Sequence, residues 1–326
     1  MKNSRLAFLR VRELGVAAVL LLQIALFTFL VGRDADGQWV FLASKNLTGI
    51  VLESAVIGVA TVGVTVVIIA GGIDLSVGGL IALSSVVVAG LLRSGQAVPI
   101  ALGGALLMGA FFGGVAASLA TWVGLPPFIA TLALMLIARG LAYMLSKGED
   151  WSIDERALGF TQSFGEGQVL GVPYLILVLI FVAALIAFAL SKTAWGRQVF
   201  AVGGNEIAAR YAGVSVHKIK WSVYVLSGIL ASLSGIIFAA KYGTGRSDTA
   251  TGYELDAVAA AVVGGASLSG GRGSIVGAVL GALIFTTLRT GLNQVPGASV
   301  YQEMIIGLVV IGAVVIDRLI QKRVAA

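Results

Sequence analysis

Long apolar stretches separated by short polar ones follow one another along nearly the whole chain. A helix needs about 20 apolar residues to cross the hydrocarbon core of a bilayer, and ten stretches reach or approach that length. The pattern predicts an all-α polytopic membrane protein with about ten transmembrane helices in a single domain, residues 1–326. The predicted spans are residues 15–31, 50–70, 75–92, 99–121, 128–145, 172–190, 222–240, 255–268, 274–290 and 301–316. The stretch 255–268 is the shortest and is rich in glycine, which makes it the weakest candidate.

The composition agrees with a membrane protein. Hydrophobic residues make up 58% of the chain and charged residues 12%, which is about half of the charged share of soluble domains. The chain has no cysteine and a single histidine, His217, so we expect no catalytic site and no metal site. It also lacks the phosphate-binding pattern G-x-x-x-x-G-K-[ST]. We therefore expect a protein that is not an enzyme and binds no cofactor, so that any ATP and Mg²⁺ would be used by a partner.

Basic side chains gather in some of the polar segments and acidic side chains in others. Residues 191–221 hold five basic side chains and one acid, whereas residues 146–171 hold two basic and five acidic ones. The two ends of the chain, residues 2–12 and 317–326, are also basic. Cytoplasmic loops of membrane proteins carry an excess of lysine and arginine. We therefore expect both termini and the 191–221 segment in the cytoplasm, with residues 146–171 outside.

The segment 191–221 has a more regular pattern than a slack linker. Gly203, Gly204 and Asn205 are typical of a turn followed by a helix start, and the next residues, E-I-A-A-R-Y at 206–211, are good helix formers. Gly213 stands where a left-handed glycine commonly ends a helix. The pattern predicts a short cytoplasmic helix between two spans. The alternative is a solvated basic loop that only orients the protein.

A few polar residues lie within or beside the apolar stretches. Asp74, in G-G-I-D-L-S-V-G-G, is predicted to be the N-cap of the third span, and the alternative is direct contact with a transported solute. Arg139 lies inside the fifth span, where it either pairs with a buried partner or extends to the membrane surface. Ser76, Glu254 and Asp256 join these two as candidates for a translocation pathway or for structural roles.

The acidic residues near the spans lie at span edges; they are Glu53, Asp74, Glu254, Asp256 and Glu303. Secondary transporters usually place ionisable residues in mid-span, where they carry protons or ions. The pattern therefore favours a permease that is driven from outside the membrane. A secondary transporter or channel for a small polar solute, and a structural membrane protein, are the alternatives.

Three long motifs give the chain a specific resemblance. They are G-G-I-D-L-S-V-G-G-L-I-A-L at 71–83, G-R-Q-V-F-A-V-G-G-N-E-I-A-A-R-Y-A-G-V-S-V-H-K-I-K at 196–220 and T-G-Y-E-L-D-A-V-A-A-A-V-V-G-G-A-S-L-S-G-G-R-G at 251–273. From about residue 45 to 320 the sequence resembles the membrane permeases of bacterial ABC sugar importers of the ribose, xylose and arabinose kind.

The resemblance implies an ABC importer permease fold in the bacterial inner membrane and a path for a monosaccharide or related small polyol. It implies a second permease subunit, identical or homologous, two ATP-binding cassette domains that hydrolyse ATP, and a periplasmic sugar-binding protein. We expect no nucleic-acid partner. The segment 244–248 departs from ribose-type members, so pentoses, hexoses, deoxyhexoses and the furanosyl signal autoinducer-2 all stay open as substrates.

The resemblance also assigns a role to the predicted cytoplasmic helix. Permeases of ABC transporters carry a short helix with an E-A-A-x-x-x-G-like pattern that docks on the ATPase and transmits its movement. The residues of this chain that match or flank that pattern are Gly204, Asn205, Glu206, Ala208, Ala209, Arg210 and Gly213. Ile207 stands where the pattern often has alanine, which leaves the individual ATPase contacts open.

Overall fold

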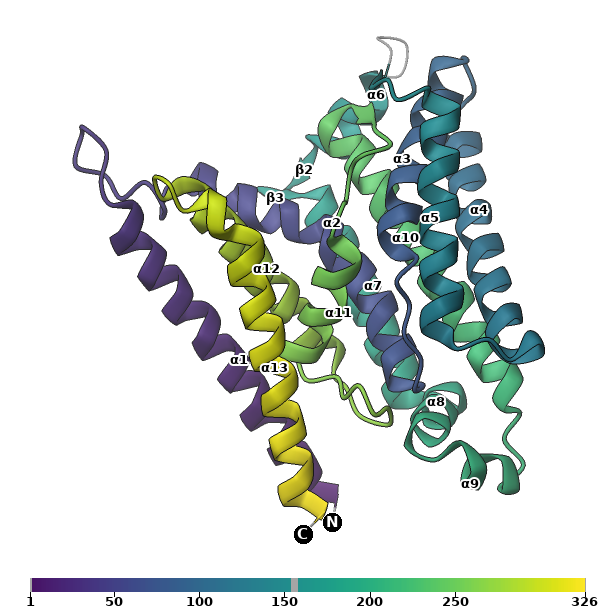
Figure 1. Cartoon of the computed structure of the whole chain (residues 1–326). Helices are drawn as coiled ribbons and strands as arrows, with labels where there is room; N and C mark the ends of the chain where they lie inside the picture. The colour runs from purple at the N-terminus through teal and green to yellow at the C-terminus, as the bar shows by residue number, and fades with distance from the viewer. Residues whose placement is uncertain (1, 154–157, 326) are drawn as a thin grey trace.

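The computed structural model describes residues 2–153 and 158–325. It is almost entirely helical (Figure 1). The helices are α1 (Lys2–Val31), α2 (Ser44–Ile69), α3 (Val77–Arg93), α4 (Val98–Ser118), α5 (Pro127–Ser146), α6 (Leu158–Phe160), α7 (Tyr174–Lys192), α8 (Ala194–Gly204), α9 (Glu206–Tyr211), α10 (Val216–Tyr242), α11 (Tyr253–Val263), α12 (Ile275–Gln294) and α13 (Gln302–Ala325). Short π-helical turns, η1 (Leu119–Val123) and η3 (Thr161–Gly165), and a 3₁₀ turn, η4 (Ser299–Tyr301), extend or connect them.

Two very short antiparallel pairs are the only sheet within the described residues. Strand β1 (Trp151–Ser152) pairs with β4 (Thr244–Gly245), and β2 (Gln168–Val169) pairs with β3 (Val172–Pro173). The first pair joins the segment before α6 to the segment after α10. It therefore ties together two loops that lie far apart in the sequence.

Each predicted span contains a helix, but the helices differ in length. Seven of those in the described residues are long and apolar enough to cross a membrane, namely α1, α2, α4 with η1, α5, α7, α10 and α12. Helix α3 and the apolar part of η4 and α13, Ser299–Gly312, are shorter. The predicted span 255–268 is a helix of 11 residues, which at 1.5 Å per residue covers about half of the hydrocarbon core. A membrane helical fold is confirmed, and the count of ten full spans is not.

The core of the bundle lies around α2 and α10. Both helices are largely buried, and α10 packs against α2, α3 and α4. Glycines bring α4 and α10 close together, because a Cβ at Gly109 would lie 2.3 Å from the carbonyl oxygen of Gly228. Such small residues let helix backbones approach each other in a membrane, where packing rather than water drives association. Helices α1, α5 and α7 are mostly exposed and apolar, as expected of surfaces that face lipid.

The two ends of the bundle differ in the segments that they carry. Figure 1 shows the start of α1, the end of α13 and the α8 and α9 helices at one end, and α6 at the opposite end. This is the relative arrangement that the charge pattern predicts for the termini and the segments 191–221 and 146–171. Residues 154–157, within the second segment, lie outside the described residues.

Two helices begin inside the bundle after a stretch of irregular backbone. After α2 ends, residues 71–76 run back from the α8 end in extended form before α3 begins at Val77 (Figure 1). After α10 ends, residues 243–252 form a loop that leads into α11. Irregular backbone inside a membrane protein is tolerated only where protein or a water-filled cavity satisfies it. The starts of α3 and α11 are therefore the places to look for polar function.

Candidate functional site

Helix α9 occupies the predicted residues, Glu206–Tyr211, and both of its ends are capped. Asn205 has an extended backbone between α8 and α9, and its Oδ1 accepts the amide hydrogen of Ala208 at 2.9 Å. This is a side-chain N-cap, which satisfies one of the free amides of the first turn. The cap also sets the angle at which α9 leaves α8.

Gly213 ends α9 in the predicted way. Its φ is +82°, and its amide donates to the carbonyl of Arg210 at 3.0 Å while the amide of Val214 donates to the carbonyl of Ala209, also at 3.0 Å. These two bonds form a Schellman motif, in which a left-handed residue stops the helix and satisfies its last carbonyls. A Cβ at Gly213 would meet nothing within 4 Å, so the backbone angle alone demands glycine here.

Glu206 joins α9 to the first turns of α10. Its two carboxylate oxygens accept hydrogen bonds from Arg210 Nη2 at 3.1 Å and from Lys220 Nζ at 2.6 Å. The hydrogen bond from Lys220, ahead of the charge of Arg210, holds the pKa of Glu206 below its ordinary value. Because the folded-state pKa is lowered, this link is complete at neutral pH and is lost only as the pH falls through the lowered pKa.

The outer side of α9 is apolar as well as basic. Ile207 is 69% exposed and Tyr211 is 89% exposed, and the Arg210 side chain is also exposed. Ala208 is exposed too, whereas Ala209 is buried against the rest of the protein. An exposed isoleucine and tyrosine beside an arginine are common in the centre of protein interfaces. The sequence marked Ile207 as a departure from the pattern, and the structure places it at the surface.

A glycine junction anchors the α8 and α9 pair to the body of the protein. A Cβ at Gly203, in α8, would lie 1.8 Å from the carbonyl oxygen of Ile69 at the end of α2, and one at Gly270 would lie 2.5 Å from the carbonyl oxygen of Gly203. The amide of Gly271 donates to the same Ile69 oxygen at 2.8 Å. Three backbones therefore touch without side chains between them. The neighbouring Gly204 contributes its backbone to the junction, because a Cβ at Gly271 would lie 2.7 Å from Gly204 Cα, but a Cβ at Gly204 itself would meet nothing within 4 Å.

The N-cap prediction for Asp74 is wrong. Helix α3 begins at Val77 with Ser76 as its N-cap residue, because the extended stretch after Gly71 and Gly72 carries the chain past Asp74 before it turns. The Asp74 carboxylate instead accepts hydrogen bonds from the backbone amide of Ser76 at 2.9 Å and from its hydroxyl at 2.6 Å. Asp74 is 1% exposed, so it stabilises the turn into α3 from a buried position.

Arg139 is partly buried and has hydrogen-bond partners within the protein. Its guanidinium donates to the carbonyl oxygens of Ser247 at 3.3 Å and Thr249 at 3.1 Å, and to the hydroxyl of Thr251 at 3.0 Å. All three belong to the loop that leads into α11. Arg139 therefore pairs within the protein, as in the first of the two alternatives, but among these three partners only Ser247 is buried, whereas Thr251 is exposed.

Asp256 and Glu254 lie in the first turn of α11 but have different surroundings. Asp256 is 1% exposed and accepts from Arg289 of α12, with Nε and Nη2 both 2.7 Å from Oδ2. Glu254 Oε2 is buried and has no hydrogen-bond partner among the described residues. That atom lies over the start of α3, where a Cβ at Gly78 would be 2.0 Å from it. Asp256 thus has a structural ion pair, whereas Glu254 Oε2 is an acceptor that no described protein group satisfies.

A second polar cluster joins α2, α10 and α11 around Glu53, which the sequence placed at a span edge without predicting its partners. Glu53 accepts hydrogen bonds from Lys241, from the hydroxyl of Tyr242 at 2.5 Å and from the hydroxyl of Tyr253 at 2.7 Å. The sequence did not single out Arg289. The available signal was the presence of charged residues close to span ends, but only the fold shows which of them meet.

Four of the five candidate pathway residues therefore gather around the starts of α3 and α11. Asp74 and Ser76 form the turn into α3, Glu254 faces that turn, and Arg139 holds the loop before α11. Asp256 points to α12 instead. The coupling candidates form a separate group at the α8 and α9 end of the molecule (Figure 1).

Comparison with known proteins identifies the class of the chain. The family described as "Branched-chain amino acid transport system / permease component" matches residues 46–314. The chain belongs to this family of permease components. The permease is 41% identical over 285 residues to the ribose import permease protein RbsC of Escherichia coli strain K12, covering 85% of this chain and 87% of that one. It is 40% identical over 278 residues to the RbsC protein of Bacillus subtilis strain 168, covering 85% and 86%.

Other relatives extend the comparison. The permease is 35% identical over 283 residues to the D-allose transport system permease protein AlsC of Escherichia coli strain K12, with 86% of each chain covered. A solved ABC transporter assigned to the metal-chelate type, in an inward-facing conformation, has the same fold, with a TM-score of 0.53, 16% identity and coverage of 91% of this chain and 96% of that one. The resemblance to permeases of ABC sugar importers is confirmed. The permease is a transport subunit and not an enzyme.

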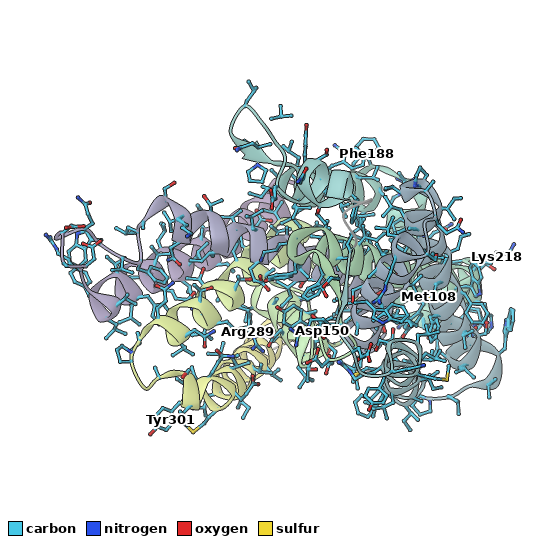
Figure 2. The ribbon with its side chains drawn as sticks, turned by 90° about the horizontal axis from the view of Figure 1, so that it is seen from above. Met108, Asp150, Phe188, Lys218, Arg289 and Tyr301 are labelled. Carbon is cyan, nitrogen blue, oxygen red and sulfur yellow. The ribbon has the colours of Figure 1, made fainter. Side chains whose placement is uncertain are left out.

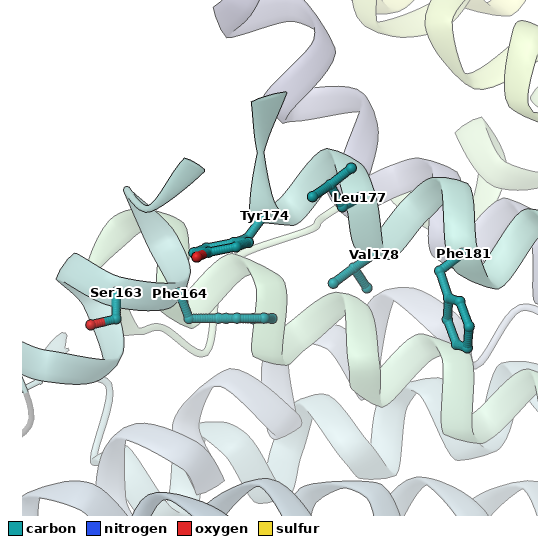
Figure 3. A pocket seen from close by; sticks show the side chains of 6 residues that line it. All are labelled: Ser163, Phe164, Tyr174, Leu177, Val178 and Phe181. Atoms are coloured by element: carbon teal, nitrogen blue, oxygen red, sulfur yellow. The ribbon is translucent and has the colours of Figure 1, made fainter. Parts of the chain in front are cut away.

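The permease contains several cavities of similar size, and they differ in chemistry. One of about 440 Å³ lies between η3 and α7 and is almost wholly apolar (Figure 3). Its lining residues are Ser163, Phe164, Tyr174, Leu177, Val178 and Phe181. Ser163 and Tyr174 are the only two of these residues with a polar side chain, so the cavity offers few groups that could orient a polar solute. It lies beside α7, a helix that is mostly exposed.

Proposed function

We propose that the permease forms the membrane path of an ATP-driven importer for a monosaccharide or a related small polyol. The observation that carries the sugar assignment is the identity of 35% to 41%, over most of the chain, to proteins named as ribose and D-allose permeases. The family description names branched-chain amino acids. The individual relatives decide between the two, because they match this chain at high identity whereas the description covers a broad family.

The proposed assembly contains two permease subunits, identical or homologous, two ATP-binding cassette domains and a periplasmic sugar-binding protein. The permease itself binds no cofactor in this proposal, and ATP and Mg²⁺ belong to the cassette domains. The basic α8 and α9 segment and both termini face the cytoplasm. A cysteine introduced at the exposed Lys218 of this cysteine-free chain tests the orientation, because an impermeant thiol reagent should label it only after the membrane is opened.

In this proposal α9 is the docking helix for the ATPase. Its exposed Ile207, Arg210 and Tyr211 offer an anchor for a partner, and its Glu206 link and the glycine junction support a rigid connection to α10 and α2. A rigid connection matters because a movement of α9 must reach the membrane helices without being absorbed by a flexible joint.

The sugar path is proposed to pass the starts of α3 and α11. A sugar loses its water in the membrane, so its hydroxyl groups need acceptors along the path. The unpartnered Glu254 Oε2 offers such an acceptor, and it lies where two discontinuous helices meet. Transporters commonly bind their substrates at such breaks near the middle of the membrane.

Uptake by purified protein tests the proposed function. The permease reconstituted with its cassette and binding proteins is expected to accumulate D-ribose or D-allose when ATP is supplied to the cassette side. A sodium or proton gradient without ATP is expected to give no accumulation. Accumulation driven by a gradient in proteoliposomes that lack the ATPase would contradict the assignment and favour a secondary transporter.

Gly78→Ala tests the pathway. The added methyl group would displace the Glu254 carboxylate, which lies 2.0 Å from the position of the new Cβ. We expect ATP-driven uptake to fall in Gly78→Ala and in Glu254→Ala, and to fall no further in the double variant, because the two changes act on the same contact. Gly103→Ala, in α4 with nothing within 4 Å, is the matched control. Full uptake in Glu254→Ala would remove Glu254 from the path.

A further inference from the structure

A cavity of about 390 Å³ lies between the end of α10 and the loop that follows it. It is lined by Phe238, Tyr242, Thr244, Arg246, Asp248 and Thr249. On the α10 side the rings of Phe238 and Tyr242 are in contact, with centroids 4.6 Å apart. On the loop side, the lining is formed by the charged pair Arg246 and Asp248 and by two threonines. This volume falls within the range of small-molecule sites.

The loop side of the cavity is held in place by the surrounding helices. Gly245 packs on α3 so closely that a Cβ would lie 2.4 Å from the carbonyl oxygen of Ser85. The Ser85 hydroxyl accepts from the amide of Arg246 at 3.2 Å and donates to the carbonyl of Ala82 at 2.8 Å. Arg139 holds the carbonyls further along the loop. The backbone at residues 245–249 is therefore anchored, while the side chains of Arg246 and Asp248 stay accessible, with exposures of 42% and 67%.

Arg246 and Asp248 form a fork that still has bonding capacity. Arg246 Nε and Nη2 donate to the two carboxylate oxygens of Asp248 at 3.1 and 3.0 Å. The hydrogen bond from Arg246 holds the pKa of Asp248 below its ordinary value, so the carboxylate is ionised at neutral pH. A guanidinium has five N–H donors and each carboxylate oxygen accepts more than one hydrogen bond. The pair therefore presents free donors beside free acceptors.

We propose that this cavity is a receiving subsite for the polyhydroxylated solute, at the end of the permease opposite α9. Neighbouring hydroxyl groups of a sugar both donate and accept, so they match the Arg246 and Asp248 fork, and the apolar C–H face of the sugar ring packs on the rings of Phe238 and Tyr242. This inference rests on the proposed sugar-import function and adds a location and a recognition mode to it.

The position of the cavity links it to the proposed path. The Tyr242 hydroxyl donates to Glu53, and Glu53 also accepts from Tyr253, the first residue of α11. Glu254 is the next residue of that helix. Asp150, 3.4 Å from Arg246, lies toward the middle of this end of the molecule (Figure 2). A solute that leaves the cavity inward therefore meets the start of α11.

A thiol-protection experiment on the complete importer tests the subsite. Thr249→Cys places the only thiol of the chain in the cavity wall, and Asp36→Cys, in the exposed loop after α1, is the matched control. Both are labelled with a maleimide in nanodiscs that contain the permease and the ATPase. Tens of millimolar D-ribose or D-allose are expected to slow labelling at Thr249→Cys several-fold and to leave Asp36→Cys unchanged, whereas betaine, which lacks hydroxyl groups, should slow neither.

A second variant tests whether the Arg246 and Asp248 pair is responsible for the protection by sugar. Arg246→Lys keeps the charge but removes the planar fork. The sugar concentration that halves the labelling rate is expected to rise about tenfold. This is the factor that the loss of one hydrogen bond to a charged group implies. Unchanged protection in Arg246→Lys would overturn the recognition mode. Asp248→Asn, at a mostly exposed side chain, is expected to weaken protection in the same direction without loss of folded protein.

The remaining outcomes separate the subsite from the proposed function. If sugar alone gives no protection and the binding protein protects Thr249→Cys with or without sugar, the surface is a docking site for that protein and the subsite is overturned. ATP-driven uptake measured on the same preparation would then still support the importer assignment. If the unmodified importer takes up no monosaccharide or small polyol when ATP is supplied, the importer assignment itself is contradicted, and the subsite with it.

Discussion

Gly213→Val is expected to uncouple the transporter while leaving the permease in the membrane at its normal level. Gly213 has a φ of +82°, and a residue with a side chain pays about 1–2 kcal/mol there. Because 1.4 kcal/mol is a factor of ten, the ratio of correctly capped to uncapped α9 falls about tenfold. ATP-driven uptake and the stimulation of ATP hydrolysis by loaded binding protein should both fall about tenfold.

A matched variant separates coupling from general destabilisation. Gly124 also has a positive φ, +79°, and a Cβ there would meet nothing within 4 Å, but this residue precedes α5 and is not part of the α9 segment. Gly124→Val carries the same backbone cost and should keep its coupling. Glu206→Lys, which places a third positive charge beside Arg210 and Lys220, should uncouple like Gly213→Val. Equal losses in Gly124→Val and Gly213→Val, or normal stimulation in both α9 variants, would mean that α9 is a solvated surface helix.

Asp256→Ala is expected to cause the largest loss of stability among single substitutions of charged residues in the described structure. Its carboxylate is buried and makes two contacts of 2.7 Å with Arg289, so its removal leaves a guanidinium without its main partner. Breaking a buried ion pair from one side costs about 3–5 kcal/mol. Unfolding of the purified permease by a denaturing detergent, followed by circular dichroism, measures the change.

The same arginine supplies the control. Glu303 lies 3.4 Å from Arg289 Nη1, but its side chain is 78% exposed, and exposed pairs contribute about 0–1 kcal/mol. Glu303→Ala should therefore unfold close to the unmodified protein. The double variant Asp256→Leu with Arg289→Met should recover most of the stability, because it removes both charges from the interior. A loss in Glu303→Ala as large as in Asp256→Ala would show that burial of the pair is not the cause.

Local features were predictable wherever neighbouring residues decide them. The short helix α9 follows from its helix formers, and its two ends follow from Asn205 and Gly213. The relative placement of the loops follows from the alternation of basic and acidic segments along the chain. Caps and charge bias act over a few residues, so they can be read without knowing the fold.

The sequence predicted helix boundaries wrongly where a helix starts later, or ends earlier, than the local pattern indicates. Asp74 has the residue type and the position of an N-cap, yet α3 starts at Val77. The reason is tertiary, since the extended residues before it are held by Tyr224 of α10, which donates to the carbonyl of Ile73. The predicted span 255–268 is also longer than the helix in the structure. Helix α11 ends at Val263, because the glycines that follow turn the chain against α12.

By itself, the sequence determined that this protein crosses the membrane many times, which segments share an end of the bundle, and that one of them carries a capped helix. Hydropathy, charge and capping are properties of short stretches, so a linear reading contains them. Only the tertiary structure decided that Asp256 pairs with Arg289, that Gly203 meets Ile69, and that the loop after α10 closes a polar cavity. Those contacts join residues far apart in the chain, and packing selects them because a buried charge or carbonyl must find a partner that no neighbouring residue supplies.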